Sequence, residues 1–372
     1  MSHGFWALGE TVGALIERPG AATGAPRAIL SVRGPRALEA LNGLLTNDLS
    51  PLSARRGVYA FALTPKGRPI ADMRVLPAPL GDAADPDHGS HDPDHPDEHV
   101  WLDVPGVACQ PLLEHLARFV PPFFARVERL DIGRASLIGP RWREAAATDP
   151  HSSGAGPPGT AIVPAAEADR LSEAGPLSVA DADPTAAPGA VLVVRREPIE
   201  GDGIDLYAPR HLLPGLGARL VDAATACGGA EAAPEDWNTL RIELGLPLFG
   251  PDISGDNLPQ ETGQTTRAVS FSKGCYTGQE VVARIHYRGH VNRLLRGVRA
   301  VATADDGVLE RGLELFDGAR RVGVLTSAAT SPRAGRIGIG YVRREIGPPA
   351  RLSASSGGEP SLALVELPFT SE

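Results

Sequence analysis

Apolar residues recur along this chain at two spacings, one typical of helices and one typical of strands. In residues 31–50 the leucines at 38, 41, 44 and 45 follow helical spacing, and Pro35 suits a first turn, which predicts an amphipathic helix. The next stretch, GVYAFALTPKGRPIADMRVLP, has two apolar runs around Pro-Lys-Gly and predicts a β-hairpin. Further along, VWLDV is typical of a strand and QPLLEHLARFV of a helix.

The same two patterns return beyond residue 190. AVLVVRRE and GIDLYAP predict strands, and LLPGLGARLVDAATACGG predicts a helix that ends in glycines. PEDWNTLRIELGL predicts another helix, with Pro234 at its start and Glu235 and Asp236 in its first turn. Beyond residue 290, the short segments RLLRGVRAV, GLELFDGARRVGVLTSA and RIGIGYVRRE predict a small β-barrel or sandwich.

Two segments lack such patterns, residues 78–98 and 145–190. The first is rich in Asp, Pro, Gly and His, a composition that cannot bury a core. Its histidines could bind a metal, or they could belong to a solvated linker that lacks the second shell a metal site needs. They are His88, His91 and His95, together with His99 directly after the segment.

Composition narrows the class of protein. The chain has 372 residues, enough for two or three domains, and 42% hydrophobic and 22% charged residues, as in soluble globular proteins. Its net charge of −9 argues against direct binding of nucleic acid. No apolar run approaches the roughly 20 residues of a membrane span, and no signal peptide is recognisable. Three widely spaced cysteines indicate a reducing compartment, so we expect a cytoplasmic protein.

The stretch FSKGCYTGQEVVARIH surrounds one of these cysteines with features of a presented thiol. Gly274 and Gly278 permit tight turns, and a cation such as Lys273 stabilises the thiolate form of a nearby cysteine. A lone cysteine can also be a small buried hydrophobe. Cys275 cannot hold an iron–sulfur cluster by itself, because a cluster takes about four ligands.

Charge and carboxylates suggest a ligand site. Residues 265–300 carry a net charge of +6 in an acidic chain, which fits either a solvated face or a site for an anion. Asp205 follows a glycine-rich turn and Asp72 lies on the second arm of the predicted hairpin. Each carboxylate could pair with the amidine-like edge of a pterin or guanine, or could be a turn cap or surface charge.

Together the motifs resemble a known family. SFSKGCYTGQEVVARIHYRGHVNRLL is similar to the motif of the YgfZ family of folate-binding iron–sulfur assembly factors. LRIELGLPLFGPDI, GDGIDLY, LTNDL and KGRPIADMRV resemble segments of a relative, the T protein (aminomethyltransferase) of glycine cleavage. The resemblance implies an α+β fold: a three-domain T-protein-like ring with a C-terminal β-barrel. It implies a discontinuous α+β domain (1–50 and 131–283), an α+β domain (51–130) and a barrel domain (284–372).

The resemblance also implies a cofactor, tetrahydrofolate, and roles for individual residues. Asp205 matches the T protein's pterin-binding glutamate, and Asp72 matches an aspartate near the transferring carbon. Two other folate contacts of the T protein fall on Trp237 and Pro198, which argues against an efficient aminomethyltransferase. The candidate catalytic residues are Cys275, Lys273 and Asp72. The candidate cofactor-binding residues are Asp205, Arg241, Arg284, Tyr276 and Gln279.

The function implied is support for the assembly or repair of iron–sulfur clusters in client enzymes, such as radical-SAM enzymes that modify tRNA. The partners implied are assembly proteins and these clients, with no resident metal and no membrane. Cys275 would act as a nucleophile or a transient cluster ligand. Two alternatives stay open: a folate-dependent aminomethyltransferase or demethylase, and a binding module without chemistry.

Overall fold

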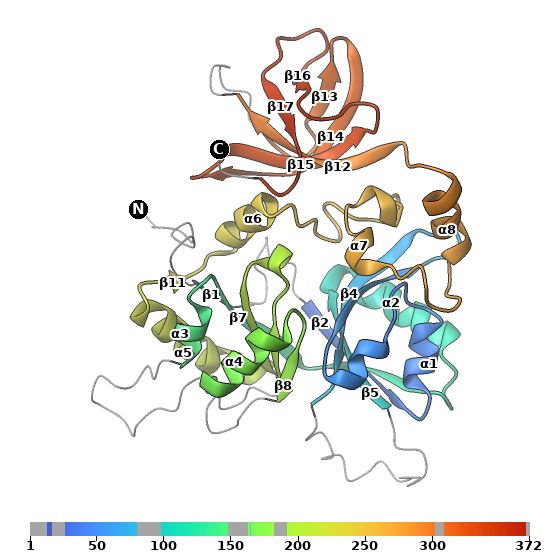
Figure 1. Cartoon of the computed structure of the whole chain (residues 1–372), viewed down its shortest axis with the longest axis vertical. Helices are drawn as coiled ribbons and strands as arrows, with labels where there is room; N and C mark the ends of the chain where they lie inside the picture. The colour runs from blue at the N-terminus through green and yellow to red at the C-terminus, as the bar shows by residue number, and fades with distance from the viewer. Residues whose placement is uncertain are drawn as a thin grey trace.

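Three β-sheets organise the described part of the chain (Figure 1). The computed structural model describes residues 13–16, 27–79, 98–147, 163, 165–181, 192–301 and 309–369. Helices cover the first two sheets, and the third closes on itself at the far end of the molecule (Figure 1). The mixture of helices and sheets confirms the predicted α+β class.

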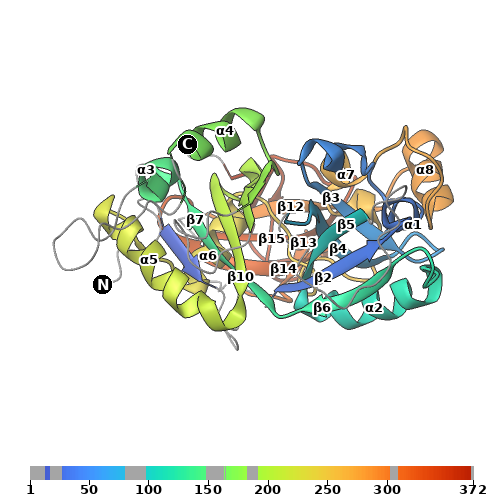
Figure 2. The ribbon, with the colours of Figure 1, turned by 90° about the horizontal axis from the view of Figure 1, so that it is seen from below.

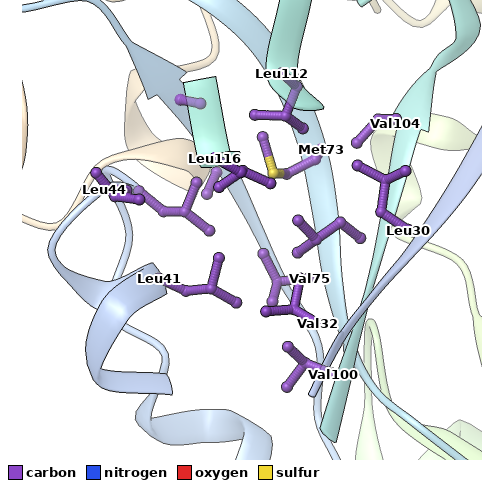
Figure 3. Packing of buried hydrophobic residues seen from close by; sticks show 14 of the residues in the cluster. Leu30, Val32, Leu41, Leu44, Met73, Val75, Val100, Val104, Leu112 and Leu116 are labelled. Carbon is purple, nitrogen blue, oxygen red and sulfur yellow. The ribbon is translucent and has the colours of Figure 1, made fainter. Parts of the chain in front are cut away.

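The N-terminal sheet is antiparallel and carries the residues on which the candidate site is built. Its strands, in spatial order, are β3 (Val58–Leu63), β4 (Pro69–Pro77), β5 (Glu98–Pro105), β2 (Arg27–Gly34) and β6 (Arg126–Leu130). Helices α1 (Ala37–Asn42) and α2 (Gly106–Phe119) cover one face. Figure 3 shows Leu41, Leu112 and Leu116 from these helices against Met73 and Val75 of β4. Alternate residues of a strand share a face, so these positions form the core.

A second sheet lies beside the first and has six strands. In spatial order they are β11 (Ala230–Glu231), β1 (Gly13–Ile16), β7 (Ile132–Ile138), β10 (Gly203–Pro209), β9 (Leu192–Arg195) and β8 (Val179–Asp181). Three helices accompany it, α3 (Trp142–Ala147), α4 (Ala165–Ala174) and α5 (Leu213–Ala226). Figure 2 shows β10 near the middle of the molecule, on the side that faces the N-terminal sheet.

The sheets group the N-terminal residues differently from the predicted domain boundary at residue 50. Strand β2, at 27–34, pairs with β5 and β6 and so lies inside the sheet built from 58–130. Only the short strand β1 joins the sheet of residues 132–231, where it pairs with β7 and β11. The pairings of β2 are between residues far apart in sequence, and no local pattern specifies them.

The third sheet matches the predicted C-terminal barrel. Its order is β13 (Glu314–Asp317), β14 (Arg320–Ser331), β15 (Gly335–Arg343), β12 (Arg293–Ala300), β17 (Leu362–Val365) and β16 (Arg351–Leu352). Phe316 and Ser353 exchange backbone hydrogen bonds of 3.0 and 2.9 Å, which brings the two edge strands together. The sheet is therefore nearly closed. Helix α6 (Pro234–Glu243) packs below it through Ile242.

Residues 249–288 return to the N-terminal sheet and cover its edge. They contain α7 (Thr265–Ala268) and α8 (Gln279–Arg288). One hydrophobic cluster joins this segment to β3, with members Tyr59, Phe61, Leu63, Ile253, Ala268, Val269, Tyr276 and Val282. The stretch around Cys275 is thus held on the N-terminal sheet, although the barrel follows it directly in sequence.

Most predicted elements have a counterpart at the predicted place. The hairpin corresponds to β3 and β4, and the helix in QPLLEHLARFV corresponds to α2. The first predicted helix is shorter than its leucine spacing indicates, because α1 ends at Asn42 while Leu44 and Leu45 are buried in the turn that follows. No helix in the described ranges combines the length and apolar composition needed to cross a membrane.

Candidate functional site

The side chain of Lys273 anchors one end of the loop that carries Cys275. Its ammonium donates to the backbone carbonyls of Asn42 (2.7 Å), Leu45 (2.9 Å) and Asn47 (2.8 Å), and lies 2.8 Å from Asn42 Oδ1. These acceptors belong to the turn after α1, where carbonyls lack partners within the helix. An ammonium has three donors, so these contacts use its full capacity.

Tyr276 anchors the other end of the loop. Its ring is 6% exposed and packs in the cluster of β3 and residues 249–282. Gly278 follows with a φ of +83° and precedes α8. A Cβ at this position would lie 2.6 Å from the carbonyl oxygen of Thr64, so the hairpin turn at 64–67 can approach the start of α8 only because residue 278 is glycine.

Cys275 lies between these two anchors and is exposed. The other two cysteines, Cys109 and Cys227, are buried at 4% and 3% exposure. The loop therefore presents a single thiol to solvent, as the sequence predicted. The Lys273 ammonium is directed to backbone carbonyls, so activation of the thiol by Lys273 stays a prediction.

Thr46 and Asn47 connect the loop to the interior. Thr46 Oγ1 donates to the carbonyl of Ala268 (2.6 Å) and accepts from the backbone N–H of Phe61 (2.9 Å). The side-chain amide of Asn47 donates to the carbonyls of Tyr59 and Arg267, each at 2.8 Å. The turn that holds Lys273 is therefore bonded to the backbone of Tyr59 and Arg267. The side chains of these two residues lie beside the candidate carboxylate of β4.

That carboxylate is Asp72, on β4. The Tyr59 hydroxyl donates to Asp72 Oδ2 at 2.5 Å, and the Arg267 guanidinium lies 3.6 Å above the Tyr59 ring. Burial raises the pKa of Asp72, against the opposing effect of Arg27 and other donors. Asp72 Oδ1 and Arg267 Nε are buried without a hydrogen-bond partner among the described residues. Such atoms call for a partner, such as a water or a ligand.

Asp205, the other candidate carboxylate, lies inside a network of charges between the first two sheets. Its Oδ1 accepts from Ser136 Oγ and Arg196 Nη1 and its Oδ2 from Arg74 Nη1, each at 2.5 Å. Arg134 Nη1 lies 3.6 Å from Oδ2. Asp205 is fully buried, and these cations hold the pKa of its carboxyl far below the usual range despite the opposing effect of burial. We call this network the central ion cluster; it contains Arg27, Arg74, Asp103, Arg134, Arg196, Glu200 and Asp205.

Glu200 extends the central ion cluster toward Asp72. Arg74 Nη2 donates to Glu200, and Arg267 Nη2 lies 3.6 Å from the same carboxylate. Although burial opposes it, the attraction of Arg74, followed by that of Arg267 and Arg196, lowers the pKa of Glu200 to about 2. Arg267 also donates to Glu197 at 2.6 Å. A continuous chain of contacts thus runs from Asp72 through Tyr59 and Arg267 to Asp205.

Asp205 accepts three hydrogen bonds from protein donors, two at Oδ1 and one at Oδ2, and its role in binding a pterin stays a prediction. Asp205 is on β10, whereas Cys275 is exposed on the loop before α8, and Figure 2 shows α8 on the side of the N-terminal sheet away from β10. The structure brings Asp72 and Asp205 into one network, and it does not bring Cys275 to Asp205.

The remaining predicted site residues lie on helices α6 and α8. The five N–H donors of Arg241 bond to Asn238, Leu246, Asp252 and Ser327, which joins α6 to the barrel and leaves none for a ligand. Gln279 is half-buried at the first position of α8, and its backbone N–H donates to the carbonyl of Tyr276. Arg284 is exposed on α8.

Sequence reasoning missed four residues that surround the two carboxylates, Tyr59, Arg74, Arg196 and Glu200, and counted a fifth, Arg267, only among the basic residues of 265–300. A signal existed for two of them. Arg74 and Arg196 interrupt or end apolar strand segments, and an arginine buried on a strand requires charged partners.

No metal site is found in the described part of the chain. His88, His91 and His95 lie outside the described residues. His99, on β5, has its Nε2 at 2.8 Å from Ser31 Oγ.

Comparisons with known proteins agree with the resemblance seen in the sequence. No family model matches the chain. It is 34% identical over 143 residues to the tRNA-modifying protein YgfZ of Serratia proteamaculans, covering 37% of this chain and 42% of that protein. It is 28% identical over 320 residues to the aminomethyltransferase of Symbiobacterium thermophilum, covering 84% of this chain and 75% of that protein.

The fold is that of an aminomethyltransferase. The glycine cleavage system aminomethyltransferase T from Bartonella henselae matches with a TM-score of 0.73 and 19% identity, over 97% of this chain and 87% of that chain. The match confirms the T-protein-like architecture predicted above. The chain spans less than half the length of the YgfZ relative named here. The chain is therefore similar to YgfZ over part of its length and to aminomethyltransferases over most of it.

Proposed function

We propose that this protein binds a tetrahydrofolate and supports the assembly or repair of iron–sulfur clusters in client enzymes, including enzymes that modify tRNA. The observation that carries the proposal is the presentation of Cys275. Lys273 and Tyr276 fix the loop from both sides, and the thiol between them is exposed. A fixed, accessible thiol suits transient contact with a cluster or a persulfide on a partner, because thiolates bind iron and attack sulfur.

The residues around Asp72 fit part of a folate. Asp72 Oδ1 is a buried acceptor without a partner among the described residues, and a pterin or its bridging amine offers N–H donors. Tyr59 orients the carboxyl through Oδ2, which leaves Oδ1 as the acceptor for a ligand. When bound, tetrahydrofolate supplies the nitrogens that carry one-carbon units. Asp205 already accepts hydrogen bonds from Ser136, Arg196 and Arg74, so we propose Asp72 as the acid that contacts the folate directly.

A folate-dependent aminomethyltransferase or demethylase is the second candidate. It is favoured by the match to aminomethyltransferases over more than four-fifths of this chain and by the presence of Asp72. It is disfavoured by Trp237, which stacks under Arg196 at 5.1 Å, in place of an arginine that the resemblance assigns to folate.

Two measurements on the unaltered protein separate these functions. The gene is introduced into a strain that lacks its own YgfZ-type gene, and tRNA modification by an iron–sulfur enzyme is measured. The purified protein is then assayed for one-carbon transfer to tetrahydrofolate from glycine-cleavage or methylamine donors. The proposal expects restored modification without efficient transfer. Efficient transfer without restored modification would support the aminomethyltransferase instead.

A further inference from the structure

We infer that the exposed face of α8 binds an acidic segment of a partner protein next to Cys275. The face consists of Arg284, Tyr287 and Arg288 and is called the α8 face below. The inference rests on the proposed function in one respect: it names the surface on which the partner of the Cys275 site docks. It requires no folate.

Helix geometry places the three side chains together. Residues separated by three or four positions in a helix are neighbours on its surface, so Arg284, Tyr287 and Arg288 form one patch. All three are exposed, and Tyr287 is 67% exposed. Neither Arg284 nor Arg288 is paired with an acid within the ranges that the structure describes. The two guanidinium groups and the tyrosine ring are thus exposed to solvent.

Aromatic contacts fix the α8 face relative to the cysteine loop. Phe271, just before the loop, stacks on His286 with ring centroids 3.7 Å apart and planes at 18°. The Tyr287 ring lies 6.2 Å from Phe271 in an edge-to-face arrangement. The loop and the helix are therefore one surface, with Cys275 on the loop and the arginines on the helix.

The positive charge of this surface favours an acidic partner. The chain has a net charge of −9, but residues 265–300 are strongly basic. Exposed arginines pair with carboxylates through two parallel hydrogen bonds, and tyrosine and arginine are enriched where proteins bind each other. An acidic segment with some apolar side chains complements two arginines that flank a tyrosine.

Single-stranded RNA fits this surface less well. Nucleobases bind to free aromatic faces, and Phe271 and His286 each use one face on the other. The negative charge of the whole chain also repels a long polyanion more than it repels a short acidic segment.

The test uses a fluorescein-labelled peptide of repeating Glu-Glu-Leu and, separately, a labelled oligouridine, each titrated into the full-length protein at low salt. We expect the peptide to bind and the oligouridine to bind more weakly. The variant R284E/R288E should weaken peptide binding about tenfold or more, and Y287A should weaken it less. R311E, at an exposed arginine on the loop before the barrel strand β13, is the matched control and should change little. The milder R284Q/R288Q should follow R284E/R288E, and thermal melts check that each variant folds.

A second readout places the peptide beside the thiol. The rate of alkylation of Cys275 by iodoacetamide should fall when the peptide is bound. The inference is overturned if the peptide does not bind, if R311E weakens binding as much as R284E/R288E, if alkylation is unchanged, or if oligouridine binds more tightly at the same residues. None of these results depends on tRNA modification, so failure here is distinct from failure of the proposed function.

Discussion

Arg74 of β4 and Asp205 of β10 form a fully buried ion pair, 2.5 Å from Nη1 to Oδ2, that joins the two α+β sheets. Arg74 also donates to Glu200, so one guanidinium holds a carboxylate of the neighbouring sheet and a carboxylate of the turn between β9 and β10. The carboxylate that the resemblance assigned to a pterin therefore stabilises the contact between two parts of the fold. Asp72, the acid proposed for folate binding, lies at the end of the same network.

Replacing Arg74 should destabilise the protein strongly. R74M leaves Asp205 and Glu200 with fewer cations in a buried site, and loss of one partner of a buried ion pair costs about 3–5 kcal/mol. R320M removes an exposed pair with Glu345, so its effect on stability should be small. Urea denaturation of both variants measures the difference. Equal losses for the two would show that the central ion cluster does not join the sheets.

The central ion cluster should also make the fold sensitive to acid. The pKa of Glu200 is lowered from 4.5 to about 2, so this carboxylate contributes stability that is present above pH 4.5 and lost as the pH falls toward 2. Asp103 and Asp205 have lowered pKa values as well and act in the same direction. The free energy of unfolding, measured from pH 7 downward, should therefore fall most steeply in this window. E200Q should be less stable at neutral pH and lose less stability across the window, and a parallel loss would contradict the role of Glu200.

Asp72 should affect the pH dependence of stability in the opposite direction. Its pKa is raised by burial, so folding favours the protonated form, and ionisation of Asp72 costs stability as the pH rises through the raised pKa. D72N removes this cost and keeps an acceptor for Tyr59. We expect D72N to be more stable than the wild type near neutral pH, with the gain shrinking toward the ordinary carboxyl pKa of 3.8. Thermal melts at several pH values measure this gain, and a gain that grows as the pH falls would refute the explanation.

The turn before α8 gives a matched pair of glycine variants. G278A forces a side chain into a φ of +83° and against the carbonyl of Thr64, which should cost about 2 kcal/mol. G274A meets no atom within 4 Å, so its cost should be below about 0.5 kcal/mol. Chemical denaturation measures both costs. If G274A were the more destabilising variant, the close approach of the hairpin turn and α8 would not be what requires glycine at 278.

The fold could be predicted from the sequence where the information is local. The β3–β4 hairpin shows in its apolar runs and turn residues, and α6 shows in Pro234 and the acids of its first turn. The position of β2 could not be predicted, since its partners β5 and β6 lie about 60 residues or more away in sequence and nothing within 27–34 identifies them.

The candidate site, too, has features that the sequence predicts and features that it does not. The exposure of Cys275 was predictable from its glycine-rich setting. The use of Lys273 as an anchor was not, because its acceptors are backbone carbonyls of residues 42–47, which any sequence provides. The contacts of Asp205 with three arginines could not be predicted for a related reason. These arginines come from different strands or from the end of one.

If the thiol of Cys275 performs the proposed support of iron–sulfur enzymes, its loss should matter more than the loss of either buried cysteine. A strain that lacks its own YgfZ-type gene receives the wild type, C275S, or the control variants C109S and C227S, and modification of tRNA by a cluster-dependent enzyme is measured. The controls change buried cysteines and report any general effect of losing a thiol. We expect C275S to abolish restoration, whereas C109S and C227S, at equal protein level, should retain it. Full restoration by C275S would contradict the role proposed for the Cys275 thiol.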